Sequence, residues 1–150
     1  MRIRLRPYHP TYVVGYFGQG YHPKSYNSQG FNDVIGKIKL HQDIEVEIVE
    51  GFDDICLKCE RRVEDEKGSV WGERHSCSSS KDPSIVKRVD AANRRVLQDL
   101  GLQFGSVIKL RELVKLLHQR IPVLEDDMMG GQQFQEKYEK GLIVLSTLWK

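Results

Sequence analysis

The sequence predicts a small, helix-rich α+β domain with a cysteine-bearing loop between its two halves. Two stretches with helical apolar spacing lie in the second half of the chain, and one strictly alternating stretch lies in the first. All three cysteines fall between them, within residues 51–82. A chain of 150 residues has the usual size of one domain and can bury roughly 70% of the surface that it exposes when unfolded. We therefore expect residues 1–150 to form a single domain with a short strand pair or small sheet.

The first 50 residues contain one clear strand. Residues 44–48 read Ile-Glu-Val-Glu-Ile, and this alternation predicts a strand with one apolar face. Residues 7–36 are rich in Tyr, Gly, Pro and Ser, which favours a loop or a short helix. A modest helix is expected over residues 26–40, although Gly30 and Gly36 weaken it.

Two amphipathic helices are predicted after the cysteine loop. Asp82 and Pro83 suit the start of the first helix, and Gly101 suits its end. The second helix covers residues 110–121 and ends at Pro122. The expected buried stripes are Ile85, Val89, Ala92, Val96 and Leu100 on the first helix and Leu110, Leu113, Val114, Leu117 and Ile121 on the second.

The C-terminal stretch, residues 122–150, is expected to pack on the rest of the domain as an extension. Residues 125–131 are typical of a mobile loop, and the chain from residue 132 onward is expected to form a short closing helix or strand. The residues expected to dock it are Leu142, Ile143, Leu145 and Leu148.

The composition favours a cytoplasmic protein. The net charge of +2 is too small to indicate a nucleic-acid or anionic membrane partner. The longest aliphatic run, residues 142–145, is far shorter than the ~20 residues of a membrane span, and no apolar segment follows the basic N-terminus. A secreted disulfide protein would leave one of three cysteines unpaired.

Cys56, Cys59 and Cys77 are the candidate ligands of one metal or iron–sulfur site. Cys56 and Cys59 form a C-x-x-C motif, whose two thiolates can turn toward one metal at about 2.3 Å. Cys77 lies far enough along the loop to return as a third ligand, and no cysteine occupies an apolar stripe. The competing interpretation is three inert loop cysteines, or the remnant of an ancestral site.

A closed four-coordinate site needs a fourth ligand, and the chain has no fourth cysteine. His75 and His9 are the candidates that would complete a Cys₃His set for zinc. In an iron–sulfur cluster the remaining iron would be open or would be taken by His9, Asp54 or Tyr12. The plainer interpretation of His9 is a loop histidine that is hydrogen-bonded to backbone.

Three motifs resemble those of a known family. Residues 4–9 read Arg-Leu-Arg-Pro-Tyr-His, residues 18–21 read Gly-Gln-Gly-Tyr, and residues 53–59 read Asp-Asp-Ile-Cys-Leu-Lys-Cys, with Cys77 following. Over residues 2–121 the chain resembles the domain of unknown function 1284 family (DUF1284), uncharacterised bacterial and archaeal proteins thought to bind an iron–sulfur cluster. The resemblance implies that the three cysteines are cluster ligands and that His9 is a matched site residue.

The chain departs from the family pattern at several positions. Tyr8 replaces a histidine, Tyr12 stands where the family has a cysteine, and Pro10 interrupts the segment. The cysteines that the family often carries near the C-terminus are absent, because Phe134, Tyr138, Gly141 and Leu142 occupy that stretch. A four-cysteine cluster within one chain is therefore excluded.

Three classes of function stay open. The first is an iron–sulfur protein in electron transfer or redox sensing, with a redox protein or a second copy of the chain as partner. The second is a zinc-stabilised interaction or regulatory module. The third is a cysteine enzyme with Cys56 or Cys59 as nucleophile and His9 as base. Asp53 and Asp54 would disfavour the thiolate of Cys56, so no catalytic residue is assigned.

Overall fold

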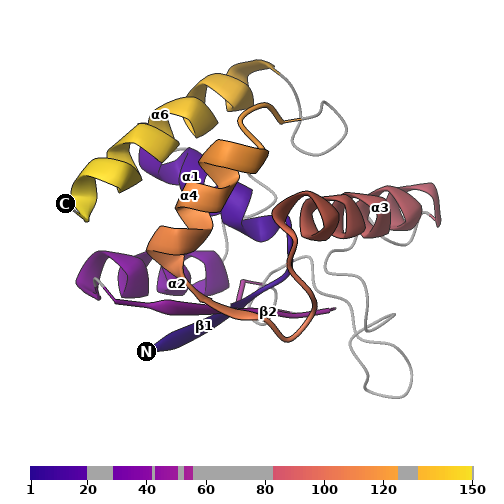
Figure 1. The fold of residues 1–150 in the computed structure, drawn as a ribbon, viewed down its shortest axis with the longest axis horizontal. Helices are drawn as coiled ribbons and strands as arrows, with labels where there is room; N and C mark the ends of the chain where they lie inside the picture. The colour runs from indigo at the N-terminus through magenta and orange to yellow at the C-terminus, as the bar shows by residue number, and fades with distance from the viewer. Residues whose placement is uncertain (20–28, 42, 51–52, 56–82, 125–131, 150) are drawn as a thin grey trace.

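The computed structural model describes residues 1–19, 29–41, 43–50, 53–55, 83–124 and 132–149 (Figure 1). Within these residues it contains three strands and five helices, so the predicted α+β class is confirmed. In chain order they are β1 (Arg2–Leu5), α1 (His9–Gln19), α2 (Gln29–Leu40), β2 (Glu45–Ile48), α3 (Pro83–Leu100), β3 (Val107–Lys109), α4 (Leu110–Arg120) and α6 (Gln132–Leu148).

The three strands form one small mixed sheet in the order β1-β2-β3. β2 is the central strand: Val46 pairs with Ile3 of the parallel β1 and with Ile108 of the antiparallel β3. In Figure 1 the strands run along the lower part of the domain, and α1, α4 and α6 are stacked above them. The strand predicted over residues 44–48 is confirmed as β2, whereas β1 and β3, with four and three residues, were not predicted.

Most predicted helices are confirmed. α3 and α4 begin and end close to their predicted bounds, and the α4 stripe is buried throughout. On α3, Ala92, Val96 and Leu100 are buried, while the side chains of Ile85 and Val89 lie outside the described part of the chain. The loop or short helix expected after residue 7 is α1, which begins at His9 with proline in its first turn.

The C-terminal stretch is a helix, not a strand. Leu142 and Leu145 on α6 are buried as expected. The docking role expected of Ile143 and Leu148 is wrong: they are 61% and 50% exposed, because the helical period turns them away from the buried face. The loop predicted over residues 125–131 lies outside the described residues. No described helix combines the length and the apolar character needed to cross a membrane.

α6 packs against α1 with almost no space between the two backbones. A Cβ placed on Gly18 of α1 would lie 1.8 Å from the carbonyl oxygen of Lys137. A Cβ placed on Gly141 of α6 would lie 1.8 Å from the carbonyl oxygen of Val14. Only glycine fits at these two crossing points, so α6 fixes the position of the helix that carries His9.

Candidate functional site

His9, the first residue of α1, is paired with Asp53 in the interior of the domain. Both side chains have no solvent exposure. The Nδ1–H of His9 donates a hydrogen bond to Oδ2 of Asp53, although the two residues are 44 positions apart in the sequence. Because the carboxylate can only accept, the ring proton lies on Nδ1, and in the neutral imidazole the lone pair lies on Nε2.

A three-residue turn, residues 53–55, holds the Asp53 carboxylate in place. Two hydrogen bonds attach this turn to β1. The Asp54 N–H donates to the Arg4 carbonyl at 3.0 Å, and the Arg4 N–H donates to the side-chain carboxylate of Asp54 at 2.8 Å. Oδ1 of Asp53 accepts the N–H of Ile55 at 3.0 Å, which closes an Asx turn. On the other side, a Cβ on Gly30 of α2 would lie 2.6 Å from the Asp54 carbonyl oxygen. The turn is therefore held between β1 and α2.

Arg6 is the second charged group of this site, and its side chain is also fully buried. Its backbone N–H donates to Oδ2 of Asp53 at 2.9 Å, the same oxygen that accepts the His9 ring proton. Its guanidinium donates to the hydroxyl of Tyr8 and lies 4.7 Å from the centre of that ring. A buried guanidinium requires such compensation, because transfer of an isolated charge out of water is costly.

The electrostatics favour an ionised Asp53 and a neutral His9. Burial alone would raise the pKa of Asp53, but His9, the Arg6 guanidinium and the Arg6 N–H outweigh it and lower that pKa from 3.8 to about 2. Burial lowers the pKa of His9 from 6.5, and the positive charge of Arg6 lowers it further against the opposing effect of Asp53. The site therefore holds one carboxylate, one guanidinium and one uncharged imidazole.

Aromatic rings enclose the imidazole. The ring centre of His9 lies 4.8 Å from that of Tyr8 and 5.8 Å from that of Tyr12. Tyr12 is 8% exposed, and its ring meets Phe134 of α6 edge-on at 5.8 Å. These rings lower the local dielectric and restrict the imidazole to one orientation.

The structure brings together some of the sequence candidates. His9 is one member of the buried pair, and Tyr12 and Asp54 lie beside the pair. Cys56, Cys59, Cys77 and His75 lie outside the described residues. Among the residues that are described, no three His, Cys, Asp or Glu side chains are grouped as metal ligands.

One interpretation of the sequence is wrong, and two residues were missed. His9 is not a loop histidine bonded to backbone, because it begins α1 and bonds to a carboxylate. The sequence predicts only an effect of Asp53 on Cys56, and it predicts no role for Arg6. The signal was present in the sequence, since both residues belong to the two quoted motifs, Arg-Pro-Tyr-His and Asp-Asp-Ile-Cys. Arg6 and Asp53 are 47 positions apart, and this spacing hid their contact.

The fold and the site define a small α+β domain built around a buried histidine–aspartate pair. The family model described as "Protein of unknown function (DUF1284)" matches residues 20–129, and the chain belongs to this family. The matched span contains Asp53 and the three cysteines, and it begins after His9. No curated protein and no solved structure matches the chain significantly.

Proposed function

We propose that this protein binds a metal centre, with Cys56, Cys59 and Cys77 as thiolate ligands and His9 Nε2 as the fourth ligand. The observation that carries the proposal is the bond from His9 Nδ1 to Asp53, a residue only three positions before Cys56. A histidine that ligates a metal through one nitrogen commonly donates its other ring N–H to a carboxylate or carbonyl, which fixes the tautomer and the ring orientation.

The charge state of the pair supports the proposal. A histidine must be neutral to ligate, and burial together with Arg6 keeps His9 in that form. The Asp53 carboxylate stays ionised, so it can strengthen His9 as a donor to a metal. Residues 53–55 are fixed on β1, and Cys56 is the next residue along the chain. The donor set thus fits a metal bound by sulfur and nitrogen.

We infer an iron–sulfur cluster as the bound group, with redox transfer or redox sensing as its role. Three thiolates and one imidazole are a set that either iron–sulfur or zinc sites accept. A cluster with one ligand that is not cysteine suits the three-cysteine count of this chain. The alternative is one zinc ion in the same Cys₃His set, in a protein-interaction module. A redox protein or a second copy of the chain is the partner class that accompanies the cluster.

Anaerobic purification of the full chain tests the proposal. We expect brown protein with broad absorption near about 400 nm, and iron and sulfide in a fixed ratio to protein. One zinc per chain without iron would replace the cluster with the zinc module. Protein that stays free of metal, even after reconstitution with iron and sulfide, would overturn the metal site.

Two histidine variants separate a ligand from a bystander. His9→Gln removes the proposed nitrogen ligand, and we expect metal affinity to fall by at least about 100-fold, since loss of a mere hydrogen-bond partner of a ligand already costs roughly 10- to 100-fold. His118→Gln is the matched control, because His118 is exposed on α4. Circular dichroism before metal analysis distinguishes loss of the ligand from loss of the fold. A folded His9→Gln protein with the metal content of the parent would rule out His9 as a ligand.

A further inference from the structure

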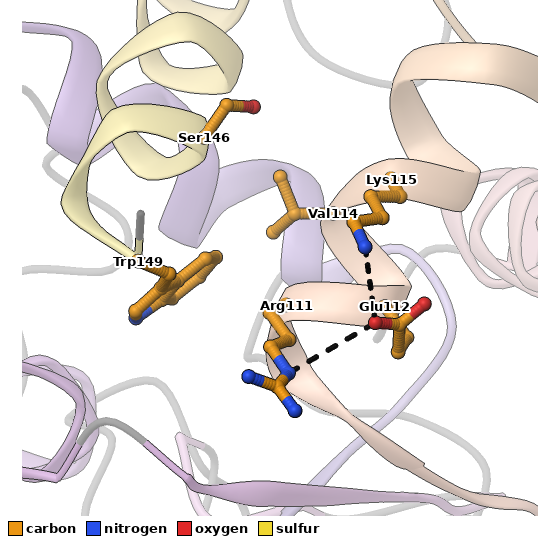
Figure 2. A pocket seen from close by; sticks show the side chains of 6 residues that line it. All are labelled: Arg111, Glu112, Val114, Lys115, Ser146 and Trp149. Atoms are coloured by element: carbon orange, nitrogen blue, oxygen red, sulfur yellow. Dashed lines mark hydrogen bonds and ion pairs between the residues drawn. The ribbon is translucent and has the colours of Figure 1, made fainter.

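A cavity of about 510 Å³ lies between the first turns of α4 and the C-terminal end of α6 (Figure 2). Small-molecule sites commonly measure roughly 300–1,000 Å³, so this cavity is large enough for a ligand. Arg111, Val114 and Lys115 lie along one face of α4, at helical spacing. Ser146 of α6 and Trp149, which directly follows α6, lie opposite that face in Figure 2.

The cavity arises from the way in which the two helices are joined. The Tyr138 hydroxyl of α6 donates to the Ile121 carbonyl at 2.8 Å, and the side chain of Gln135 accepts the Leu124 N–H at 2.7 Å. These bonds attach the first half of α6 to the end of α4, so the two helices run antiparallel. The cavity lies at the opposite end of the pair, and Arg111, Lys115 and Trp149 are among its lining residues.

The cavity has an excess of positive charge. Nζ of Lys115 lies 3.2 Å and Nε of Arg111 lies 3.9 Å from the same oxygen, Oε1 of Glu112. The single carboxylate of Glu112 thus pairs with two cations, and the three side chains together carry a charge of +1. The helix ends contribute partial charges of opposite sign, about +0.5 at the start of α4 and about −0.5 at the end of α6, which offset each other. The side chains therefore decide which ligand charge the cavity prefers.

Trp149 and Val114 give the cavity an apolar part. Trp149 presents its indole from the α6 side in Figure 2, and Val114, which is 1% exposed, lies on the α4 side. An indole beside a guanidinium favours planar molecules, because the ring offers a stacking face and the guanidinium a forked donor. A site with this lining combines one charge contact with one stacking surface.

We propose that this cavity binds a small aromatic molecule with a single negative charge, whose ring stacks on Trp149 and whose anionic group meets Arg111 and Lys115. The site is separate from the His9–Asp53 pair, and the proposal does not depend on a metal. It assigns to α4 and α6 a ligand-binding role beyond their packing.

A matched pair of probes tests the charge requirement. The anion 2-naphthoate and the neutral 2-naphthamide have nearly the same shape, so a charge-selective site must separate them. By titration calorimetry on the full chain we expect one naphthoate per chain, with a Kd at least about tenfold below that of naphthamide. In ¹⁵N-correlated spectra the Trp149 indole N–H signal should move during the titration. Trp71→Phe assigns that signal, since the chain has two tryptophans.

Two arginine variants on one helix locate the charge contact. Arg111→Gln removes a cation from the cavity and should raise the naphthoate Kd about tenfold, with naphthamide unaffected. Arg120→Gln is the control, because Arg120 is exposed at the far end of α4 and does not line the cavity. Arg111 is half-exposed, so the unfolding midpoint of its variant should match that of the parent.

Three results would each overturn the proposal. These are equal affinity for the two probes, an unchanged naphthoate Kd in Arg111→Gln, and a stationary Trp149 signal at saturation. Failure of naphthoate to bind at all up to about 5 mM would do the same.

Discussion

The two ends of α1 are held in opposite ways. At its first residue, the helix is fixed by polar groups: His9 bonds to Asp53, and Asp53 also accepts the Arg6 N–H. Near its last residues, the helix is fixed by shape, because Gly18 touches the backbone of α6 and leaves no room for a side chain. One end depends on charge and hydrogen bonding, and the other on close packing.

The difference shows which end can be part of a chemical site. A contact between backbones positions a helix but offers no donor or acceptor to a ligand. The polar end holds an imidazole whose orientation and charge state are fixed by its neighbours. The packed end is what keeps that imidazole from shifting with the helix. Substitutions at each end should therefore cost stability for different reasons, and they can be separated.

The largest effect is expected at the polar end, from Asp53→Asn. The substitution removes the buried carboxylate that compensates Arg6 and orients His9, so the free energy of unfolding should fall by about 4 kcal/mol. Asp54→Asn is the neighbouring control. Within the described part of the chain, its carboxylate accepts only the Arg4 N–H, in a partly exposed position, so the loss should stay under about 1 kcal/mol. Denaturant unfolding measures both, and equal losses would contradict the special role of Asp53.

The packed end should lose somewhat less, and only through steric conflict. Gly18→Ala places a methyl group against the Lys137 carbonyl, which is backbone and cannot rotate away, so we expect a loss of about 3 kcal/mol. Gly36→Ala in α2 is the matched control, since its Cβ would meet nothing within 4 Å. There the same substitution should add about 0.5–1 kcal/mol through helix propensity. Two losses of similar size would mean that helix geometry, and not the α6 contact, decides the result.

The sequence predicted the packed elements better than the polar site. The apolar stripe on α4 can be recognised from the spacing of apolar residues within residues 110–121 alone, and its burial is confirmed. The His9–Asp53 bond joins residues 44 positions apart, and no periodicity records such a contact. The short strands β1 and β3 were missed for a related reason, because each becomes a strand only by pairing with β2. The contacts of Gly18 and Gly141 between α1 and α6 also cannot be predicted from one sequence, since the sequence does not distinguish a glycine that a neighbouring helix requires from other glycines.

A smaller loss of stability is expected from the hydrogen bond that attaches α6 to the end of α4. Tyr138→Phe removes the buried bond of 2.8 Å to the Ile121 carbonyl and keeps the ring in place. We expect the free energy of unfolding to fall by about 1 kcal/mol, the usual value for one hydrogen bond. The measurement is denaturant unfolding in parallel with Gly18→Ala. The two losses should fall short of their sum in the double variant, because Gly18 contacts Lys137, which is next to Tyr138 on α6, and neighbouring sites are coupled. A loss equal to the sum would show that α6 makes its contacts with α1 and with the end of α4 independently.

The smallest effect on stability is expected from an exposed ion pair. Its comparison with the buried His9–Asp53 pair shows how much burial contributes to the stability of the buried pair. Lys109 lies 2.8 Å from Asp43, and its hydrogen bond and charge lower the pKa of that carboxyl below 3.8. In Lys109→Gln the Asp43 midpoint, followed by NMR, should rise toward the usual value, and Lys115→Gln should leave it unchanged.

Because the folded pKa of Asp43 is the lower one, any stability from the pair is present above the unfolded pKa and is lost as the pH falls through the folded value. A clear shift of the Asp43 titration midpoint in Lys109→Gln, with an unchanged unfolding temperature, would show that this exposed ion pair changes the pKa of Asp43 but does not stabilise the fold. If Lys109→Gln instead lowered the free energy of unfolding as much as Asp53→Asn, burial would not explain why the His9–Asp53 pair stabilises the start of α1.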